Sequence, residues 1–319
     1  MLVDLLSLCA RQGRWFLVAG LVAGIALPAL AEAMRVLIAP MVVFLLFLAV
    51  LRLGPEGVRA GLAGWRGAVL AVLGLQLALP LMAVAVFAAL GGLGHPLALG
   101  LVLMLAAAPI TGSPNLAVLA GAPPAPALRQ LVLGTALLPL TALPVFWFIP
   151  AFGSPGAVLA AVGGLLGLIG LAGGLAMALR LLGVVSATAR ARAAMDGIAA
   201  IVMGVVVIGL MSAVGPALFS GDEVWITLAL VMLANLALQF GIGLSMRRAS
   251  PDVAPSMGIT AGNRNMALFL GVLPEPTVDM LLLFIGCYQV PMYLTPLLLG
   301  GWYRRLAALS QADGRGGRR

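Results

Sequence analysis

Long apolar runs separated by short polar segments dominate the hydropathy pattern of this chain. Most runs are close to the roughly 20 residues that an α-helix needs to cross a bilayer. The pattern therefore predicts an all-α membrane protein with ten transmembrane spans. The runs lie at about residues 15–31, 35–52, 66–91, 96–121, 128–150, 157–183, 195–219, 223–246, 254–274 and 277–303.

Composition strengthens this interpretation. Hydrophobic residues make up 63% of the chain and charged residues 9%, whereas soluble domains carry roughly 25% charged residues. The ten runs leave no room for a soluble domain. Only residues 310–319, rich in Gly and Arg, are expected to form a disordered cytoplasmic tail near anionic lipid headgroups.

The basic residues indicate the orientation in the membrane. All 18 are arginine, a usage typical of a GC-rich bacterial genome. If the N-terminus is cytoplasmic, Arg264 lies within a span, Arg35 lies outside, and the other 18 − 2 = 16 lie inside. The positive-inside rule then predicts a multi-pass protein of the bacterial inner membrane with both termini cytoplasmic. Five acidic residues gather on the opposite side: Glu32, Asp222, Glu223, Glu275 and Asp279.

The first span has a competing interpretation. Arg11 and Arg14, the apolar run that follows and Ala29-Leu30-Ala31 resemble a secretory signal with its cleavage site. Cleavage would leave nine spans and would disturb both the arginine pattern and the internal symmetry described next.

Two short segments share a Gly-x-x-Asn-(Leu/Met)-Ala pattern. They are Gly112–Ala117 and Gly262–Ala267, and their asparagines are 265 − 115 = 150 residues apart. Pro139 and Pro291 repeat at a similar offset of 152 residues, as do Pro144 and Pro296. We therefore expect two inverted five-helix repeats, residues 1–150 and 151–319.

The two segments fall where helices should be interrupted. Pro109 and Pro114 flank Gly112 in the fourth span, and each proline removes a backbone donor and obstructs the preceding turn. In the ninth span the interior weak points are Gly258 and Gly262. Broken helices free backbone polar groups at membrane depth, so we expect the fourth and ninth spans to cross and form a polar cage at the midplane.

These residues give the chain a resemblance to the bile acid/sodium symporter family of ten-helix transporters, over nearly its whole length. The resemblance rests on the span count, on Ser113-Pro114-Asn115, and on the segments 135–139 and 260–267. It implies that a panel of spans 1, 2, 6 and 7 moves against a core of spans 3–5 and 8–10, with substrate bound near the crossing.

The resemblance also implies sodium sites, from which this chain departs. Where family members place a glutamate and a glutamine four residues apart, this chain has Thr260 and Arg264. Sodium needs oxygen ligands, and a guanidinium offers none, so at least one sodium site should be lost. The residual ion-binding candidates are Ser113, Asn115, Thr135, Gln76 and Thr260.

A charge inside an apolar span is a functional-site hypothesis by default. We expect Arg264 to replace a bound cation and to hold a carboxylate or other oxyanion by paired hydrogen bonds. The alternative is that Arg264 pairs with a buried acid or with carbonyl groups and only ties helices together. The substrate-binding candidates are Arg264, Asn115, Asn265, Asn263, Ser113, Thr260, Gln289 and Tyr293. Asn235 and Gln239, four residues apart, are further cavity candidates.

The sequence thus favours a secondary transporter of a small organic anion or amphipath, working by alternating access with weakened or lost sodium dependence. The alternative within transport is a drug/metabolite-type exporter, which has the same repeat symmetry but needs no broken fourth and ninth spans. A membrane sensor or intramembrane enzyme is less favoured, because the sequence shows no Ser/His dyad, paired aspartates or metal cluster. We predict no catalytic or metal-binding residues, no cofactor apart from Na⁺ at the residual ion-binding candidates, and no nucleic-acid partner.

Overall fold

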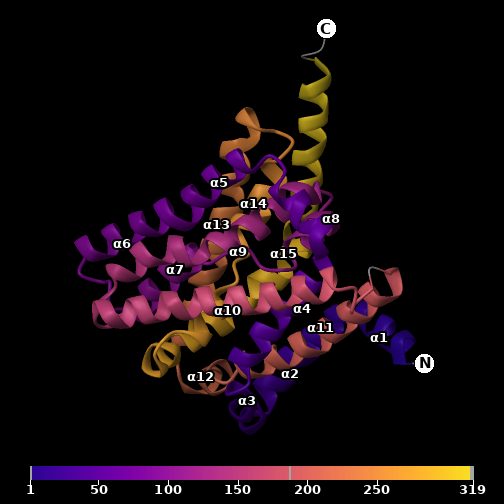
Figure 1. Ribbon diagram of the computed structural model, residues 1–319. Coiled ribbons are helices and arrows are strands. Elements are labelled where there is room, and N and C mark those ends of the chain that lie inside the picture. The colour runs from indigo at the N-terminus through magenta and orange to yellow at the C-terminus, as the bar shows by residue number, and fades with distance from the viewer. Residues whose placement is uncertain (1, 187, 317–319) are drawn as a thin grey trace. The chain divides into compact units, whose positions relative to one another are not determined.

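The chain folds into helices along almost its whole length (Figure 1). The computed structural model describes residues 2–186 and 188–316, and within these the only strand-like pairing is an isolated bridge between Pro109 and Arg264. Seven helices are long and apolar enough to cross a membrane, and an eighth candidate is a bent pair. The prediction of an all-α protein with several apolar membrane helices is therefore confirmed.

The count of seven or eight spans differs from the predicted ten in an informative way. The first apolar run is bent by 111° between Trp15–Ala26 and Pro28–Arg35, because Pro28 cannot donate to the preceding turn. The runs at 96–121 and 254–274 contain no helix of spanning length, since both are interrupted. The departures from regular spans therefore lie at three identifiable backbone breaks.

The chain divides into two compact units. The first contains Met1–Arg59, Ala151–Thr227 and Ala267–Cys287, and the second contains Ala60–Pro150, Leu228–Met266 and Tyr288–Arg319. Helices α4 (Ile38–Leu62), α13 (Glu223–Ala249) and α15 (Glu275–Gly316) contribute residues to both units, as do the short segments η2 (Pro150–Phe152) and η3 (Met266–Gly271). Helix α15 extends into the tail for which the sequence predicts disorder, and residues 317–319 lie outside the described residues.

The helices that lie wholly or mainly in the first unit range from single short turns to long apolar spans. They are α1 (Leu2–Arg11), α2 (Gly13–Ala26), α3 (Pro28–Arg35), α4 (Ile38–Leu62), η2 (Pro150–Phe152), α10 (Pro155–Leu181), α11 (Ala189–Leu210), α12 (Val214–Ser220) and η3 (Met266–Gly271). Hydroxyl side chains cap the N-termini of two of these helices. Ser154 accepts a hydrogen bond from the backbone amide of Ala157, and Thr188 accepts one from the backbone amide of Ala191.

Glycines let the N-terminal helices approach α11 closely in this unit. A methyl group on Gly197 would lie 2.0 Å from the carbonyl oxygen of Leu6 in α1. One on Gly20 in α2 would lie 2.5 Å from the carbonyl oxygen of Gly204. Close backbone contact of this kind is how small residues hold membrane helices together, so α1 and α2 are integral parts of the unit's packing.

The second unit holds the shorter, interrupted helices. They are α5 (Trp65–Leu73), the π-helical segment η1 (Gly74–Ala78), α6 (Leu79–Ala89), α7 (Pro96–Ala106), α8 (Ser113–Leu119), α9 (Pro124–Trp147) and α14 (Ala254–Gly262). The middle of this unit is α9, which packs against α5, α7, α8 and α14.

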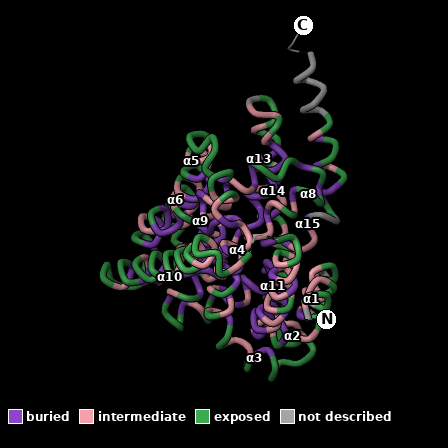
Figure 2. Tube along the Cα trace, turned by 45° about the vertical axis from the view of Figure 1, so that its right-hand side comes forward, coloured by how far each residue is buried: buried purple, intermediate pink, exposed green. Residues whose placement is uncertain are grey.

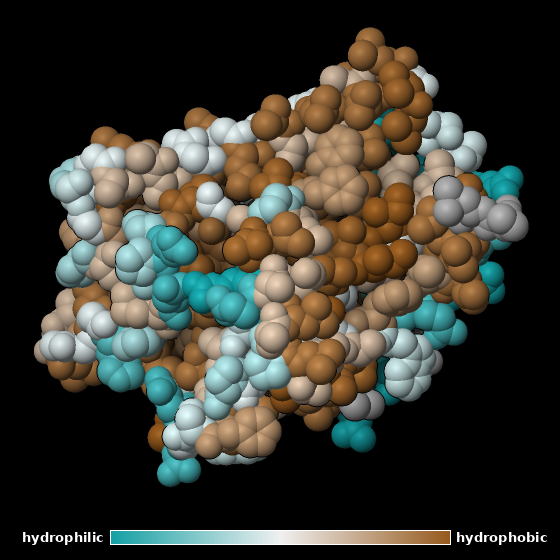
Figure 3. Space-filling view, turned by 90° about the horizontal axis from the view of Figure 1, so that it is seen from below, coloured by the Kyte–Doolittle hydropathy of each residue, from teal (hydrophilic) through white to brown (hydrophobic). Residues whose placement is uncertain are grey.

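Large apolar side chains remain exposed on the outer helices. Much of α10 is exposed (Figure 2), including Leu159, Leu166 and Leu171 at 55%, 62% and 69%. Apolar side chains also cover much of the surface in view in Figure 3. Exposed apolar area of this extent is expected where the surrounding solvent is lipid.

Candidate functional site

The candidate site begins with the two interruptions predicted from the sequence. Helix α7 ends at Ala106 and α8 begins at Ser113, with Pro109 in the extended backbone between them. Helix α14 ends at Gly262, and its C-cap residue Asn263 has φ −110° and ψ 90°. The predicted breaks in the fourth and ninth apolar runs are therefore confirmed.

The position of the second break differs in detail from the expectation. Gly262 ends its helix, but Gly258 stays inside α14. A methyl group on Gly258 would lie 2.8 Å from the carbonyl oxygen of Gln239. This glycine therefore serves close packing of α14 against α13, and the prediction that it weakens the helix is wrong.

The two broken segments pair with each other through their backbones. The amide of Ile110 donates to the carbonyl of Asn263 at 3.0 Å, and the amide of Asn265 donates to the carbonyl of Ala108 at 2.7 Å. This is the antiparallel bridge between Pro109 and Arg264. Each break thus satisfies backbone groups that the other has freed, which an apolar environment requires.

Arg264 places its guanidinium at the ends of both broken helices. Its Nε donates to the carbonyl of Ala261 at 2.9 Å, and its Nη1 donates to the carbonyl of Ala107 at 3.0 Å. Ala261 lies in the last turn of α14 and Ala107 is the C-cap of α7. The C-terminal end of a helix carries partial negative charge, so the guanidinium sits where a cation is favoured.

The charge of Arg264 is enclosed but incompletely bonded. The side chain is 1% exposed, and none of the ion pairs among the described residues involves it. Nη2 is buried without a hydrogen-bond partner. A guanidinium has five N–H donors, and two are used, so three remain for a ligand.

Tyr288 joins the two sides of the second break, a role that the sequence did not single out. Its hydroxyl accepts the backbone amide of Arg264 at 2.9 Å and donates to the carbonyl of Gly262. Asn235 Nδ2 also donates to that carbonyl, at 2.6 Å. No local pattern distinguishes Tyr288 from the other aromatic residues in its run, because its partners are 24 and 26 residues away.

A buried polar network continues from this point. Gln239 Nε2 donates to Asn235 Oδ1 at 2.6 Å and to Thr295 Oγ1 at 3.0 Å, and Tyr303 donates to Gln239 Oε1 at 2.7 Å. The four-residue spacing of Asn235 and Gln239 indicated this shared face. These hydrogen bonds hold the backbone around the break in place. Asn235 and Gln239, which the sequence suggested as cavity-lining residues, are buried and bonded within this network.

The other substrate-binding candidates occupy varied surroundings in the same unit. Asn263 is buried, donates to the carbonyl of Ile259 at 2.8 Å and accepts from Thr295 at 3.2 Å. Asn265 is half-buried and joins the bridge through its backbone amide. In α15, Gln289 is buried and Tyr293 is half-buried.

Two of the hydroxyl candidates donate to carbonyls three residues earlier in the chain. Ser113 Oγ donates to the carbonyl of Ile110 at 2.8 Å, and Thr260 Oγ1 donates to the carbonyl of Met257 at 3.1 Å. Asn115 is exposed and Thr135 is half-buried. The bridge therefore holds Asn263, Arg264 and Asn265 at the paired breaks, whereas none of the hydrogen bonds between described residues joins Asn115 to them.

Gln76 reaches the crossing from the π-helical segment η1. Its Nε2 donates to the carbonyl of Gly134 at 3.1 Å, while its Oε1 is buried without a partner. A methyl group on Gly134 would lie 2.4 Å from that oxygen and 3.0 Å from Cδ of Pro109. Single π-helical turns often mark functional sites, and this one places an acceptor beside the first break.

The carbonyl groups of the crossing are already engaged. Those of Ala107 and Ala261 accept from Arg264, those of Ala108 and Asn263 accept backbone amides, and that of Gly262 accepts from Asn235 and Tyr288. A sodium ion needs several free oxygen ligands. At the helix ends themselves, the carbonyls of Ala107 and Ala261 have the guanidinium of Arg264 as their partner.

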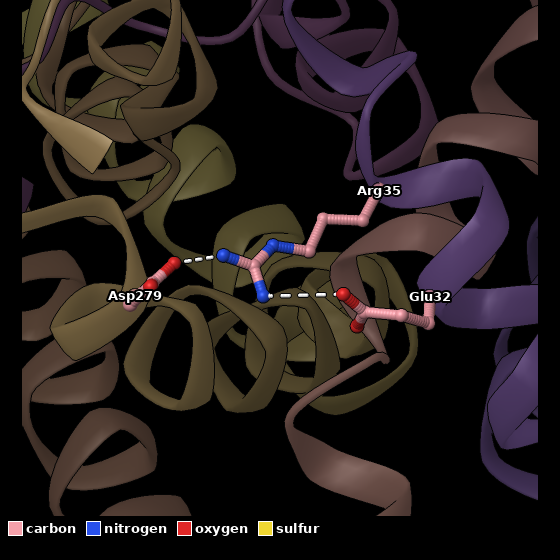
Figure 4. A network of polar contacts seen from close by, with 3 residues as sticks. All are labelled: Glu32, Arg35 and Asp279. Carbon is pink, nitrogen blue, oxygen red and sulfur yellow. Dashed lines mark hydrogen bonds and ion pairs between the residues drawn. The ribbon is translucent and has the colours of Figure 1, made fainter. Parts of the chain in front are cut away.

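A second charged cluster lies in the other unit (Figure 4). Arg35 contacts Asp279 and also Glu32, whose Oε1 is 3.5 Å from Nη1. The three residues were all predicted to lie on the non-cytoplasmic side. Their carboxylates are half or more exposed, and such pairs contribute little to stability, so this cluster is separate from the candidate site.

Comparison with known proteins gives no assignment, since no protein-family model and no curated protein matches the chain.

Proposed function

We propose that the protein is a secondary transporter of a small organic anion or amphipath. The observation that carries the proposal is the buried guanidinium of Arg264, which has three unused donors and no acidic partner among the described residues. A planar guanidinium suits a carboxylate or other oxyanion, which can accept two of those donors together.

The backbone geometry supports this function over the drug/metabolite-type exporter. That alternative needs no interruption near Pro114 and Arg264, yet helices end at Ala106 and at Gly262. Interrupted helices at which polar groups converge are characteristic of transporter binding sites.

Alternating access is the mechanism that we propose. Since Arg264 is 1% exposed, an anion reaches Nη2 only when neighbouring helices move. The division into two compact units supports such motion. In contrast with the panel implied by the family resemblance, the first unit also includes Ala267–Cys287, which begins just after the second break.

The test is thermal unfolding of the detergent-purified protein against anions of increasing apolar size, from acetate and pyruvate to cholate and taurocholate, with sodium or choline as the only cation. A ligand at 100 times its Kd stabilises by about 2.7 kcal/mol. We expect at least one anion to raise the unfolding temperature equally in both salts, and Arg264→Gln to abolish the shift.

Arg66→Gln is the matched control, because Arg66 is an exposed arginine of the same unit and its loss should leave the shift intact. A shift that requires sodium would show that Arg264 does not replace the cation. If Arg264→Gln keeps the rise in unfolding temperature, or if no anion raises the unfolding temperature of the wild-type protein, Arg264 does not bind the anion. Its role would then be limited to the hydrogen bonds that connect two helix ends.

A further inference from the structure

The positive charge at the crossing cannot leave the protein, which distinguishes it from a coupling ion. Arg264 is covalently part of the chain, and its Nε and Nη1 are held by the carbonyls of Ala261 and Ala107. A sodium ion enters and leaves with each transport cycle, whereas a guanidinium stays protonated and in place. This inference rests on the proposed function.

The empty and loaded forms of the site therefore differ by one charge. Without a ligand, the site carries the charge of Arg264 and the unpartnered Nη2. With a monoanion bound, two of the three free donors are satisfied and the net charge is zero. The dipoles of α7 and α14 stabilise the guanidinium locally, but a dipole has no net charge, so it does not alter this difference.

A net charge makes reorientation of the empty site unfavourable. Moving one elementary charge across a typical membrane potential changes an equilibrium on the order of 50-fold, and an inside-negative potential would hold the empty site towards the cytoplasm. The neutral loaded site has no such bias. Binding of a monoanion thus removes the electrical obstacle to reorientation.

We infer that the protein is an anion exchanger, in which the Arg264 site changes its access rapidly only with a monoanion bound. One anion then moves inwards for each anion that moves outwards. The carbonyls of Ala108, Gly262 and Asn263 already accept hydrogen bonds, so a coupling cation would have to compete for them.

The experiment uses the full-length protein in proteoliposomes with [3H]taurocholate and, separately, [14C]pyruvate as probes. Both stay ionised at neutral pH and therefore leak slowly. Uptake is compared between vesicles that contain the same unlabelled anion and vesicles that contain none, with an inside-negative potential clamped by a potassium gradient and valinomycin in both. We expect at least tenfold faster uptake into the loaded vesicles, and an exchange rate that does not change when the membrane potential is clamped at different values.

Arg264→Gln gives the sharper comparison. Removal of the charge should bring the ratio of exchange to net uptake towards one at saturating probe, whereas Arg66→Gln should keep the wild-type ratio. If Arg264→Gln binds neither probe, the ratio of exchange to net uptake in the wild-type protein still distinguishes an exchanger from a net transporter.

The outcomes separate the two proposals. Wild-type uptake that is equally fast into loaded and empty vesicles overturns exchange and leaves the transport function standing. Absence of uptake of either probe under both conditions contradicts the transport function and the exchange inference together.

Discussion

At the scale of single residues, a few side chains take over the bonds that the helix breaks have released. The carbonyl of Gly262 would belong to the next helical turn if α14 continued, and it accepts from Asn235 and Tyr288 instead. Arg264 serves the carbonyls of Ala107 and Ala261 in the same way. Unsatisfied backbone groups cost several kcal/mol in an apolar medium, so these side chains make the breaks possible.

Tyr288→Phe tests this role. The change keeps the ring but leaves the buried amide of Arg264 without its acceptor, and an unmatched buried polar group costs roughly 1–3 kcal/mol. We expect a lower midpoint of thermal unfolding in detergent. Tyr293→Phe, a half-buried tyrosine of the same helix, should change stability by less than about 0.5 kcal/mol. Equal effects of the two substitutions would contradict the bridging role.

At the scale of secondary-structure elements, three irregular segments of the second unit meet at one glycine. The π-helical segment η1, the extended residues around Pro109 and the middle of α9 approach one another at Gly134. The sequence around Gly134 is that of an ordinary helix. Only the residues close to it in space explain why a glycine is needed there. The absence of a Cβ lets α9 lie close to both Gln76 and Pro109.

Gly134→Ala should therefore destabilise the protein. The added methyl group would lie 3.0 Å from the rigid ring of Pro109 and would displace Gln76, and overpacking of this kind costs roughly 1–3 kcal/mol. Gly163→Ala in α10 is the control, because nothing lies within 4 Å of its added methyl group. That change should be neutral or stabilise by about 0.5–1 kcal/mol. Unfolding midpoints of both variants in detergent provide the measurement, and a stable Gly134→Ala protein would refute the close approach.

At the scale of the whole molecule, the arginine distribution predicts the orientation that the fold itself leaves open. Helices α11 and α12, together Ala189–Ser220, form one candidate span. Its N-terminal side is rich in arginine, with Arg180, Arg190 and Arg192, and Asp222 follows its C-terminal end. The positive-inside rule therefore predicts that the first end is cytoplasmic.

Cysteine labelling tests this orientation. Ser186 and Ser220 are exposed and flank the α11–α12 span, and each is replaced by cysteine in a background with Cys9→Ser and Cys287→Ser. A membrane-impermeant maleimide should label Ser220→Cys in intact spheroplasts, and Ser186→Cys only after permeabilisation. The reverse pattern would show that the orientation is wrong.

The linear pattern of residues was sufficient to predict an all-helical membrane protein and two of its interruptions, although it gave ten spans where seven or eight candidates are found among the described residues. Run length and proline placement act through local backbone geometry, so the breaks near Pro109 and after Gly262 could be read without a fold. The sequence also marked Arg264, because a charge in an apolar run is costly wherever the run packs.

The partners of these residues depended on the tertiary structure. Ala107 and Tyr288 lie 157 and 24 residues from Arg264, and no local periodicity connects them. The same applies to Gly258, which looked like a weak point but instead allows α14 to pack against Gln239. Hydrogen bonds and close packing act between neighbours in space, and the fold alone determines which distant residues become neighbours.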